Sequence, residues 1–339
     1  MSVEPTARKA KFRRTVRRIG TGALVAVVLL VTATLVVGEM LQSSMRNSNP
    51  PPGELVDVGG HRMHINCTGE GRPTVVLSAG LDDFSIFWSL VQPEVAKFSR
   101  VCSFDRSGLG WSEPSADPRT IRNMVTEVHT LLLNAGVTGP FVMVGHSFGG
   151  AQVELYASEY PEDVVGVVLV DAAPADLFLR IPTWAGLIAQ KVGLYRTLAA
   201  LDSLGLLAFT PTSIPTRGLP DEAVAQYRAI ASSTGYFRTA VAENEAFEDN
   251  LAEVRAAQVN LGSVPLVVIS RGYWEAIPAL SATDNDLAWK SWQEMQSELA
   301  DLSADSLQII ATDSEHNVHL QQPQLVVDAI REVVEGTGD

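Results

Sequence analysis

The stretch FVMVGHSFGG at residues 141–150 carries the strongest structural signal in the chain. Its first four residues are apolar and typical of a buried strand, and residues 148–159 show a helical pattern. Residues 145–149 read G-x-S-x-G, so Ser147 stands at a tight strand-to-helix turn. Such a turn requires small flanking residues and holds the serine Oγ near a helix N-terminus, which attracts developing negative charge. Ser147 is therefore a candidate nucleophile.

Around this turn, short apolar runs alternate with helical patterns, which indicates an α/β fold with a mostly parallel sheet flanked by helices. Residues 172–264 interrupt the alternation with Leu- and Ala-rich helical segments punctuated by prolines. We therefore expect a helical cap at about residues 174–262, inserted after the sixth strand. The predicted strands cover residues 55–58, 62–67, 74–78, 100–104, 141–144, 165–170, 266–269 and 307–311. The predicted helices outside the cap cover residues 84–97, 121–135, 148–159, 287–302 and 324–334.

The charge is unevenly distributed along the chain. Residues 1–18 carry seven Lys or Arg and a single acidic residue, a net charge of +6, which leaves −20 for the rest of a chain with total charge −14. A body this acidic lacks the basic surface that nucleic-acid binding requires. Nucleic-acid binding is therefore excluded as the main role.

Residues 19–38 form an uncharged, apolar run of twenty residues. As a helix, this run would span about 30 Å, the thickness of the hydrocarbon core of a bilayer. It is longer than the apolar region of a signal peptide, and no A-x-A-like cleavage site follows it. We therefore expect a single transmembrane anchor. Cleavage followed by secretion is the alternative.

The basic residues before the anchor set its expected orientation. Positively charged flanks stay in the cytoplasm, so residues 1–18 form a cytoplasmic tail and the body lies on the extracytoplasmic side of the membrane. Residues 39–53 are polar and Pro-rich, as expected of a spacer. The folded domain then covers residues 54–339.

At this point the chain resembles the α/β-hydrolase superfamily, over about residues 55–334. Residues 75–81, VVLSAGL, are similar to the strand and turn that carry one oxyanion-hole amide in that superfamily. The resemblance implies backbone N–H donors from Leu81 and from Phe148, which follows the serine. Ala79 replaces a histidine that is frequent in the family, but the amide donor does not depend on that side chain. Residues 105–112, DRSGLGWS, match the family's D-x-x-G-x-G-x-S loop, which we interpret as structural.

The resemblance places the general base on the loop after the last strand, where only His316 and His319 stand. His316 precedes Pro323 by seven residues, the spacing of the family's Gly-His and Pro pair, although Glu315 replaces the glycine. His316 is therefore the predicted base. His319 is expected to face the start of the final helix or solvent.

Two carboxylates remain candidates for the acid that orients the histidine. In the superfamily, this acid follows either the sixth or the seventh strand. Asp171 directly follows the predicted strand at residues 165–170, and the chain resembles a subgroup of hydrolases that use an Asp there. Glu275 lies in the loop after the seventh strand, in a segment similar to the family's G-x-x-D. Asp171 is the preferred candidate and Glu275 the alternative.

The chain has two cysteines, Cys67 and Cys102. In the fold that the resemblance implies, the second and fourth strands are antiparallel neighbours, and these cysteines lie at ends that meet. Together with the inferred export, this placement predicts a disulfide. Two cysteines without paired histidines do not make a zinc site, so we expect no metal.

These residues predict a serine hydrolase that forms an acyl-enzyme, most simply a carboxylic ester hydrolase. A serine nucleophile excludes the superfamily members that use an aspartate, the haloalkane dehalogenases and epoxide hydrolases. Apolar segments at residues 181–188 and 198–209 suit a hydrophobic small-molecule or lipid-like ester. The sequence has no dinucleotide, P-loop or H-E-x-x-H motif, so no cofactor is expected. Amide, peptide or C–C bond hydrolysis, or a catalytically inactive membrane-tethered binding protein, are the alternatives.

Overall fold

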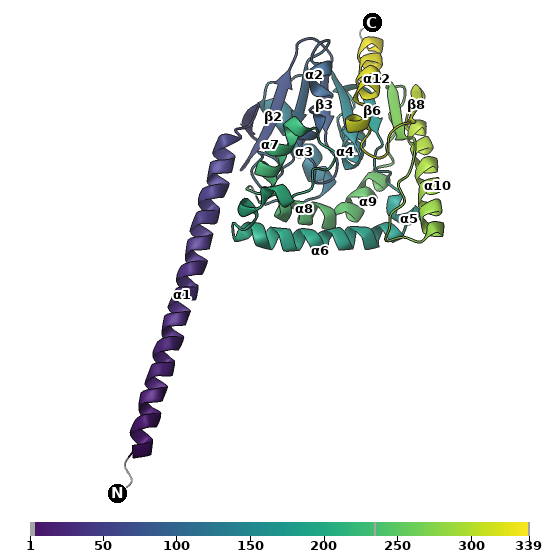
Figure 1. Cartoon of the computed structure of the whole chain (residues 1–339). Helices are drawn as coiled ribbons and strands as arrows, with labels where there is room; N and C mark the ends of the chain where they lie inside the picture. The colour runs from purple at the N-terminus through teal and green to yellow at the C-terminus, as the bar shows by residue number, and fades with distance from the viewer. Residues whose placement is uncertain (1–3, 234, 338–339) are drawn as a thin grey trace.

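The computed structural model describes residues 4–233 and 235–337 (Figure 1). Its strands form one sheet in the order β1-β2-β4-β3-β5-β6-β7-β8. β2 is antiparallel to both neighbours, and the other pairs are parallel. The predicted eight-stranded, mostly parallel sheet is thus confirmed. The strands are β1 (Glu54–Asp57), β2 (Arg62–Thr68), β3 (Thr74–Ser78), β4 (Val101–Phe104), β5 (Phe141–His146), β6 (Val164–Val170), β7 (Leu266–Arg271) and β8 (Ser306–Ala311).

Helices cover both faces of the sheet, which explains why the central strands are apolar throughout. One core contains side chains from α3, α4 and α10, and the other contains side chains from α2 and α12. Local signals fix several helix starts: the Thr120 hydroxyl caps α3 and the Ser281 hydroxyl caps α10. Outside the cap, the helices are α2 (Gln92–Val95), α3 (Ile121–Asn134), α4 (Phe148–Glu159), α10 (Ala282–Leu299), α11 (Val318–Gln321) and α12 (Pro323–Gly336), with 3₁₀ turns η1 (Ser85–Trp88) and η4 (Ala300–Leu302).

A helical cap connects β6 to β7, as the break in the strand–helix alternation predicts. It contains a third hydrophobic cluster that includes Phe84 and Phe87 from the turn after β3 together with Tyr227 and Tyr236 from the cap. The longest cap helix lies across the base of the body in Figure 1. The cap elements are α5 (Leu177–Arg180), α6 (Thr183–Ser203), η2 (Leu207–Phe209), η3 (Pro211–Ser213), α7 (Asp221–Ala231), α8 (Tyr236–Glu245) and α9 (Phe247–Ala257).

The N-terminal region forms one long helix, α1 (Glu4–Ser48), which leaves the body beside the cap (Figure 1). Residues 11–48 include a window long and apolar enough to cross a membrane. Residues 39–48, expected to be part of a spacer, instead continue the helix and pack on the cap, and the prolines at 50–52 follow its end. Of the expected cytoplasmic tail, residues 1–3 lie outside the described residues.

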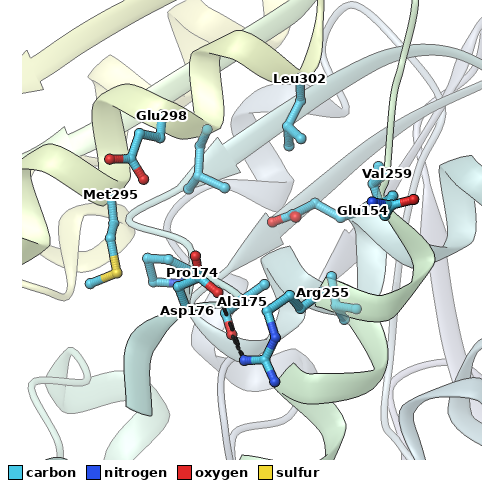
Figure 2. A pocket seen from close by; sticks show the side chains of 12 residues that line it. Glu154, Pro174, Ala175, Asp176, Arg255, Val259, Met295, Glu298 and Leu302 are labelled. Carbon is cyan, nitrogen blue, oxygen red and sulfur yellow. Dashed lines mark hydrogen bonds and ion pairs between the residues drawn. The ribbon is translucent and has the colours of Figure 1, made fainter. Parts of the chain in front are cut away.

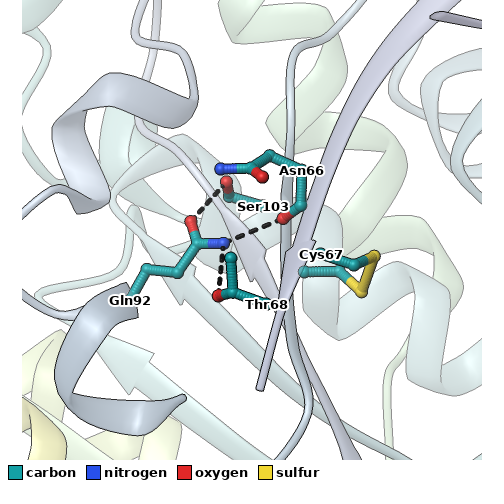
Figure 3. The surroundings of a disulfide bond; sticks show 6 residues. Asn66, Cys67, Thr68, Gln92 and Ser103 are labelled. Atoms are coloured by element: carbon teal, nitrogen blue, oxygen red, sulfur yellow. Dashed lines mark hydrogen bonds between the residues drawn. A yellow bond between two sulfur atoms is a disulfide. The ribbon is translucent and has the colours of Figure 1, made fainter. Parts of the chain in front are cut away.

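A disulfide joins Cys67 of β2 to Cys102 of β4, with the two Cα atoms 4.0 Å apart. The two residues are direct cross-strand partners, which brings their side chains to the same face of the sheet. Gln92 of α2 lies nearby, where its amide donates to the Asn66 carbonyl and accepts from the Ser103 hydroxyl (Figure 3). The predicted disulfide is confirmed.

Removing this disulfide should destabilise the fold substantially. The bond closes a loop with a sequence separation of 35 residues. Loop-closure entropy for that length corresponds to about 4 kcal/mol of folding free energy. We therefore expect the Cys67→Ala/Cys102→Ala variant to unfold at a clearly lower urea concentration than the oxidised protein. Reduced wild-type protein is the matched control. Equal midpoints for the double variant and the oxidised protein would contradict this expectation.

Candidate active site

Ser147 sits in a strained turn between β5 and α4. Its backbone has φ 52° and ψ −122°, in a region that residues other than glycine rarely adopt. The flanking glycines are required by close packing, since a Cβ on Gly145 would lie 2.3 Å from the Gly149 carbonyl oxygen. A Cβ on Gly149 would lie 2.4 Å from the Ser78 carbonyl oxygen. The G-x-S-x-G pattern thus lets α4 approach β3 and β5 while the serine faces outward.

Ser147, His316 and Asp171 form a continuous chain of hydrogen-bonding contacts. His316 Nε2 lies 2.9 Å from Ser147 Oγ, and His316 Nδ1 lies 2.6 Å from Asp171 Oδ2. The three residues follow β5, β8 and β6, whose carboxyl ends meet at one edge of the sheet. A hydroxyl, an imidazole and a carboxylate in this order can transfer the serine proton to the histidine.

Asp171 is fully buried and accepts several hydrogen bonds. Its Oδ1 accepts from the indole N–H of Trp292 at 2.9 Å and from the backbone N–H of Arg271 at 3.1 Å, and its Oδ2 accepts from Arg271 Nε at 2.6 Å. Burial alone would raise the pKa of Asp171, but the Arg271 charge and these hydrogen bonds hold that pKa below its usual value. The carboxylate is therefore ionised at neutral pH.

Arg271 also contacts His316. One terminal nitrogen of its guanidinium lies 2.7 Å from His316 Nδ1, and the guanidinium stacks on Trp292 at 4.3 Å from the ring centroid. Burial lowers the pKa of His316 below its ordinary value, and the positive charge of Arg271 lowers it further. The imidazole of His316 therefore stays neutral down to a lower pH than the imidazole of an ordinary histidine. It must be neutral to accept a proton.

The other sequence candidates lie elsewhere. Glu275 is exposed, and its carboxyl contacts that of Glu315, whose pKa is raised first by burial and then by this neighbour. Of the two positions expected for His319, solvent is wrong. His319 is buried, with its ring 4.1 Å from that of His146 and 5.0 Å from that of Trp88, because α11 packs against η1, which ends at Trp88.

His146, next to the serine, supports the histidine loop. Its Nε2 donates to the backbone carbonyl of His316 at 2.9 Å, which fixes the position of the loop after β8. Burial lowers the pKa of His146 well below its ordinary value, so the ring is neutral. The contact explains how a loop more than 160 residues away in sequence is held over Ser147.

A cavity of about 340 Å³ lies in front of Ser147 and His316. Its wall is mainly apolar, and its polar side includes Asp83, Lys191 and Arg217. Burial raises the pKa of Asp83 to about 6, against the opposing effect of Arg217. Leu81 lines the same cavity, and Phe148 begins α4 directly after Ser147. The apolar lining includes Leu81, Leu177, Trp184, Leu187, Ile188, Phe247, Ile277 and Trp292.

Ion pairs connect the cap to the turn that contains Leu81. Asp82 accepts from Lys191 at 2.8 Å and from Arg217 at 3.0 Å. On the other side of the turn, Arg106 donates to the carbonyls of residues 79 and 80 and pairs with Glu243 of α8 at 2.7 Å. Both Arg106 and Glu243 are almost completely buried. The cap therefore fixes the backbone next to the serine.

A second, smaller cavity of about 230 Å³ lies between α4, α9 and α10 (Figure 2). The carboxyl of Glu154 from α4 is buried beside it, and its Oε1 has no hydrogen-bond partner. Burial raises the pKa of Glu154 to about 8, so this carboxyl is neutral at pH 7. Among the residues that the structure describes, no group of three or more His, Cys, Asp or Glu is arranged to hold a metal ion.

Two residues around Asp171 escaped sequence analysis. Arg271 ends β7, the parallel neighbour of β6, so the adjacency of these strands could have placed it beside Asp171. Trp292 lies in α10, 121 residues after Asp171, and no local pattern marks it.

Known proteins share this fold. A thermophilic esterase from Thermogutta terrifontis is 20% identical, with a TM-score of 0.58 over 84% of this chain and 99% of that chain. The enol-lactonase from Burkholderia xenovorans LB400 is 19% identical, with a TM-score of 0.59 over 83% of this chain and 100% of that chain. Likeness at this level of identity shows the fold alone.

Sequence relatives and a family model agree with the fold. The uncharacterized protein YqjL of Bacillus subtilis (strain 168) is 27% identical over 265 residues, 78% of this chain and 85% of that protein. Lipase LipV of Mycobacterium tuberculosis is 35% identical over 114 residues, 33% of this chain and 42% of that protein. The model described as "Alpha/beta hydrolase family" matches residues 75–329. With this match over most of its length, the chain belongs to the alpha/beta hydrolase family.

Proposed function

We propose that the protein is a membrane-anchored serine hydrolase that cleaves carboxylic esters. The observation that carries this proposal is the chain of contacts from Ser147 through His316 to Asp171 at the edge of a mostly apolar cavity. In this assignment Ser147 is the nucleophile, His316 the general base and Asp171 the acid that orients the imidazole. The apolar lining supports an ester with a hydrophobic portion.

The reaction proceeds in two halves. His316 Nε2 takes the proton of the Ser147 hydroxyl as Oγ attacks the ester carbonyl carbon. Backbone N–H groups of Leu81 and Phe148 stabilise the resulting oxyanion, and the Asp171 carboxylate stabilises the imidazolium. The intermediate expels the alcohol, which receives the proton from His316. Water, deprotonated by His316, then attacks the acyl-serine, and the carboxylic acid leaves as Ser147 is restored.

The anchor is part of the proposal. Residues 19–38 cross the membrane once, the basic tail remains in the cytoplasm and the body lies outside it. The disulfide supports this location, since such bonds persist in oxidising compartments.

Covalent labelling tests the assignment of the nucleophile. The full-length protein in detergent should react with a fluorophosphonate probe and hydrolyse p-nitrophenyl butyrate. Ser147→Ala should lose the label and lower kcat by about 10⁴-fold or more. Ser112→Ala, another buried serine outside the site, is the matched control. Folded wild-type protein that neither labels nor turns over the ester would instead indicate an inactive, membrane-tethered binding protein.

Arg271 should set the pH range of activity. Replacing it by Met removes the positive charge beside His316, so the imidazolium is less destabilised and the pKa of His316 rises. The acidic limb of the kcat/KM profile should therefore move to higher pH. Arg271→Lys keeps the charge and should stay closer to the wild-type profile. If the acidic limb of the kcat/KM profile of Arg271→Met lay at the same pH as that of the wild-type protein, Arg271 would not affect the pKa of His316.

A further inference from the structure

Most of the apolar half of α1 is left uncovered by the other residues that the structure describes. Every residue of α1 from 11 to 33 is exposed, although this stretch contains most of the uncharged run at residues 19–38. The apolar part of this exposed helix, residues 19–33, favours an apolar surrounding. α1 becomes buried against the body first at Gly38, where the apolar run ends. The body therefore begins at the level where the anchor would leave the hydrocarbon.

The part of the body at that level is the end of α6. The backbones of Gly38 and Gly205 are so close that a Cβ on Gly38 would lie 2.8 Å from the Gly205 carbonyl oxygen. Four residues further along α1, Gln42 donates to the Asp202 carboxylate at 2.9 Å. Figure 1 shows α6 running across the base of the body, with the free half of α1 continuing beyond it. These contacts hold the cap beside the end of the apolar run of α1.

The exposed side of this cap region carries several large apolar side chains, and its exposed Arg196 is paired with Glu245 of α8. Leu194 and Leu204 are 58% and 46% exposed, and Phe209 of η2 is 45% exposed. The acidic residue of α6, Asp202, is buried and bonded to Gln42, in a chain with net charge −14. The inward side of α6 contributes Lys191 and the apolar residues Trp184, Leu187 and Ile188 to the cavity in front of Ser147.

We propose that the outer face of the cap, formed by α6 and η2, lies on the surface of the bilayer that α1 spans. This inference rests on the proposed anchor. The occupant of the face is the lipid surface, because the apolar run of α1 ends beside the apolar end of α6. The cap face and the anchor thus form one continuous membrane-contacting region. The cavity in front of Ser147 then lies on the far side of a helix that touches lipid.

Site-specific fluorescence can test this arrangement in the full-length protein. Both native cysteines are in the disulfide, so an introduced cysteine is the single reactive thiol. Leu194→Cys and Leu204→Cys report on the cap face, Val28→Cys reports on the anchor, and Leu133→Cys on α3 is an equally exposed control. Each variant is labelled with an environment-sensitive nitrobenzoxadiazole dye and reconstituted in phosphatidylcholine nanodiscs, with and without lipids that carry a spin label near the headgroup.

The dye at Leu194 and Leu204 should emit at shorter wavelength than at Leu133 and lose most of its intensity to the spin-labelled lipid. The dye at Val28 separates the two proposals. If Val28 reports a hydrocarbon environment while both cap positions match Leu133, the cap proposal is overturned and the anchor stands. If Val28 also matches Leu133, the anchor is wrong and the cap proposal falls with it. Fluorophosphonate labelling of the same samples reports separately on the hydrolase assignment.

Discussion

Replacing Asp171 by Asn is expected to lower kcat for ester hydrolysis by about 10⁴-fold, the loss typical when the acid of a catalytic triad becomes neutral. An amide keeps the shape but stabilises neither the required tautomer of His316 nor the imidazolium. Glu275→Gln should leave kcat nearly unchanged, because Glu275 is exposed and its carboxyl contacts Glu315. Steady-state kinetics on p-nitrophenyl butyrate measure both variants.

The comparison is matched, since both changes neutralise one carboxylate in the loops that follow neighbouring strands. Circular dichroism spectra of both variants exclude unfolding as the cause of a loss. A larger loss in Glu275→Gln than in Asp171→Asn would assign the acid to the loop after β7. It would also mean that this loop closes over His316 during the reaction.

Arg106→Met should lower the free energy of unfolding by about 3–5 kcal/mol, a large loss for the removal of one charged side chain. The change leaves the buried Glu243 carboxylate with Arg119 as its remaining ion-pair partner and removes the donors to the carbonyls of residues 79 and 80. Urea unfolding of the full-length protein in detergent measures the effect as a shift of the midpoint at constant slope.

Two further variants separate the buried pair from ordinary side-chain effects. Arg62→Met removes an exposed pair with Glu113 and should shift the urea midpoint far less than Arg106→Met does. Arg106→Met/Glu243→Met should be less destabilised than the sum of its single changes, because the two fully buried charges are then removed together and only the partly exposed Arg119 loses its partner. A cost for Arg106→Met as small as that for Arg62→Met would show that the buried network does not hold the cap to the sheet.

The sheet was predictable because its strands are short and its central strands, β3, β5 and β6, are apolar on both faces. The ends of each predicted strand lie within two residues of the ends of the observed strand, for example at Thr74–Ser78 and Ser306–Ala311. The extent of α1 was not predictable in the same way. Residues 39–48 are polar, and their composition does not show that Gln42 and Arg46 bind backbone carbonyls of the cap. That contact joins residues about 160 to 190 positions apart, so no local window contains it.

The site was predictable to the extent that motifs define it. The turn at residues 145–149 and the spacing from His316 to Pro323 pointed to two of the three residues in the chain of contacts. No motif shows which carboxylate contacts His316. Asp171 is held in place for this contact by Arg271 of β7 and Trp292 of α10. The partners of a strand-end carboxylate come from neighbouring elements, so a sequence pattern leaves both Asp171 and Glu275 open.

The attachment of the cap on two sides has a consequence for how molecules enter the cavity. Lys191 and Arg217 bind Asp82 on the sheet side, and Gln42 of α1 binds Asp202 on the other. A swinging lid would have to break these contacts together in every turnover. We therefore expect the cavity to have an entrance of fixed width, which admits molecules according to their cross-section. We also expect turnover to start without a lag.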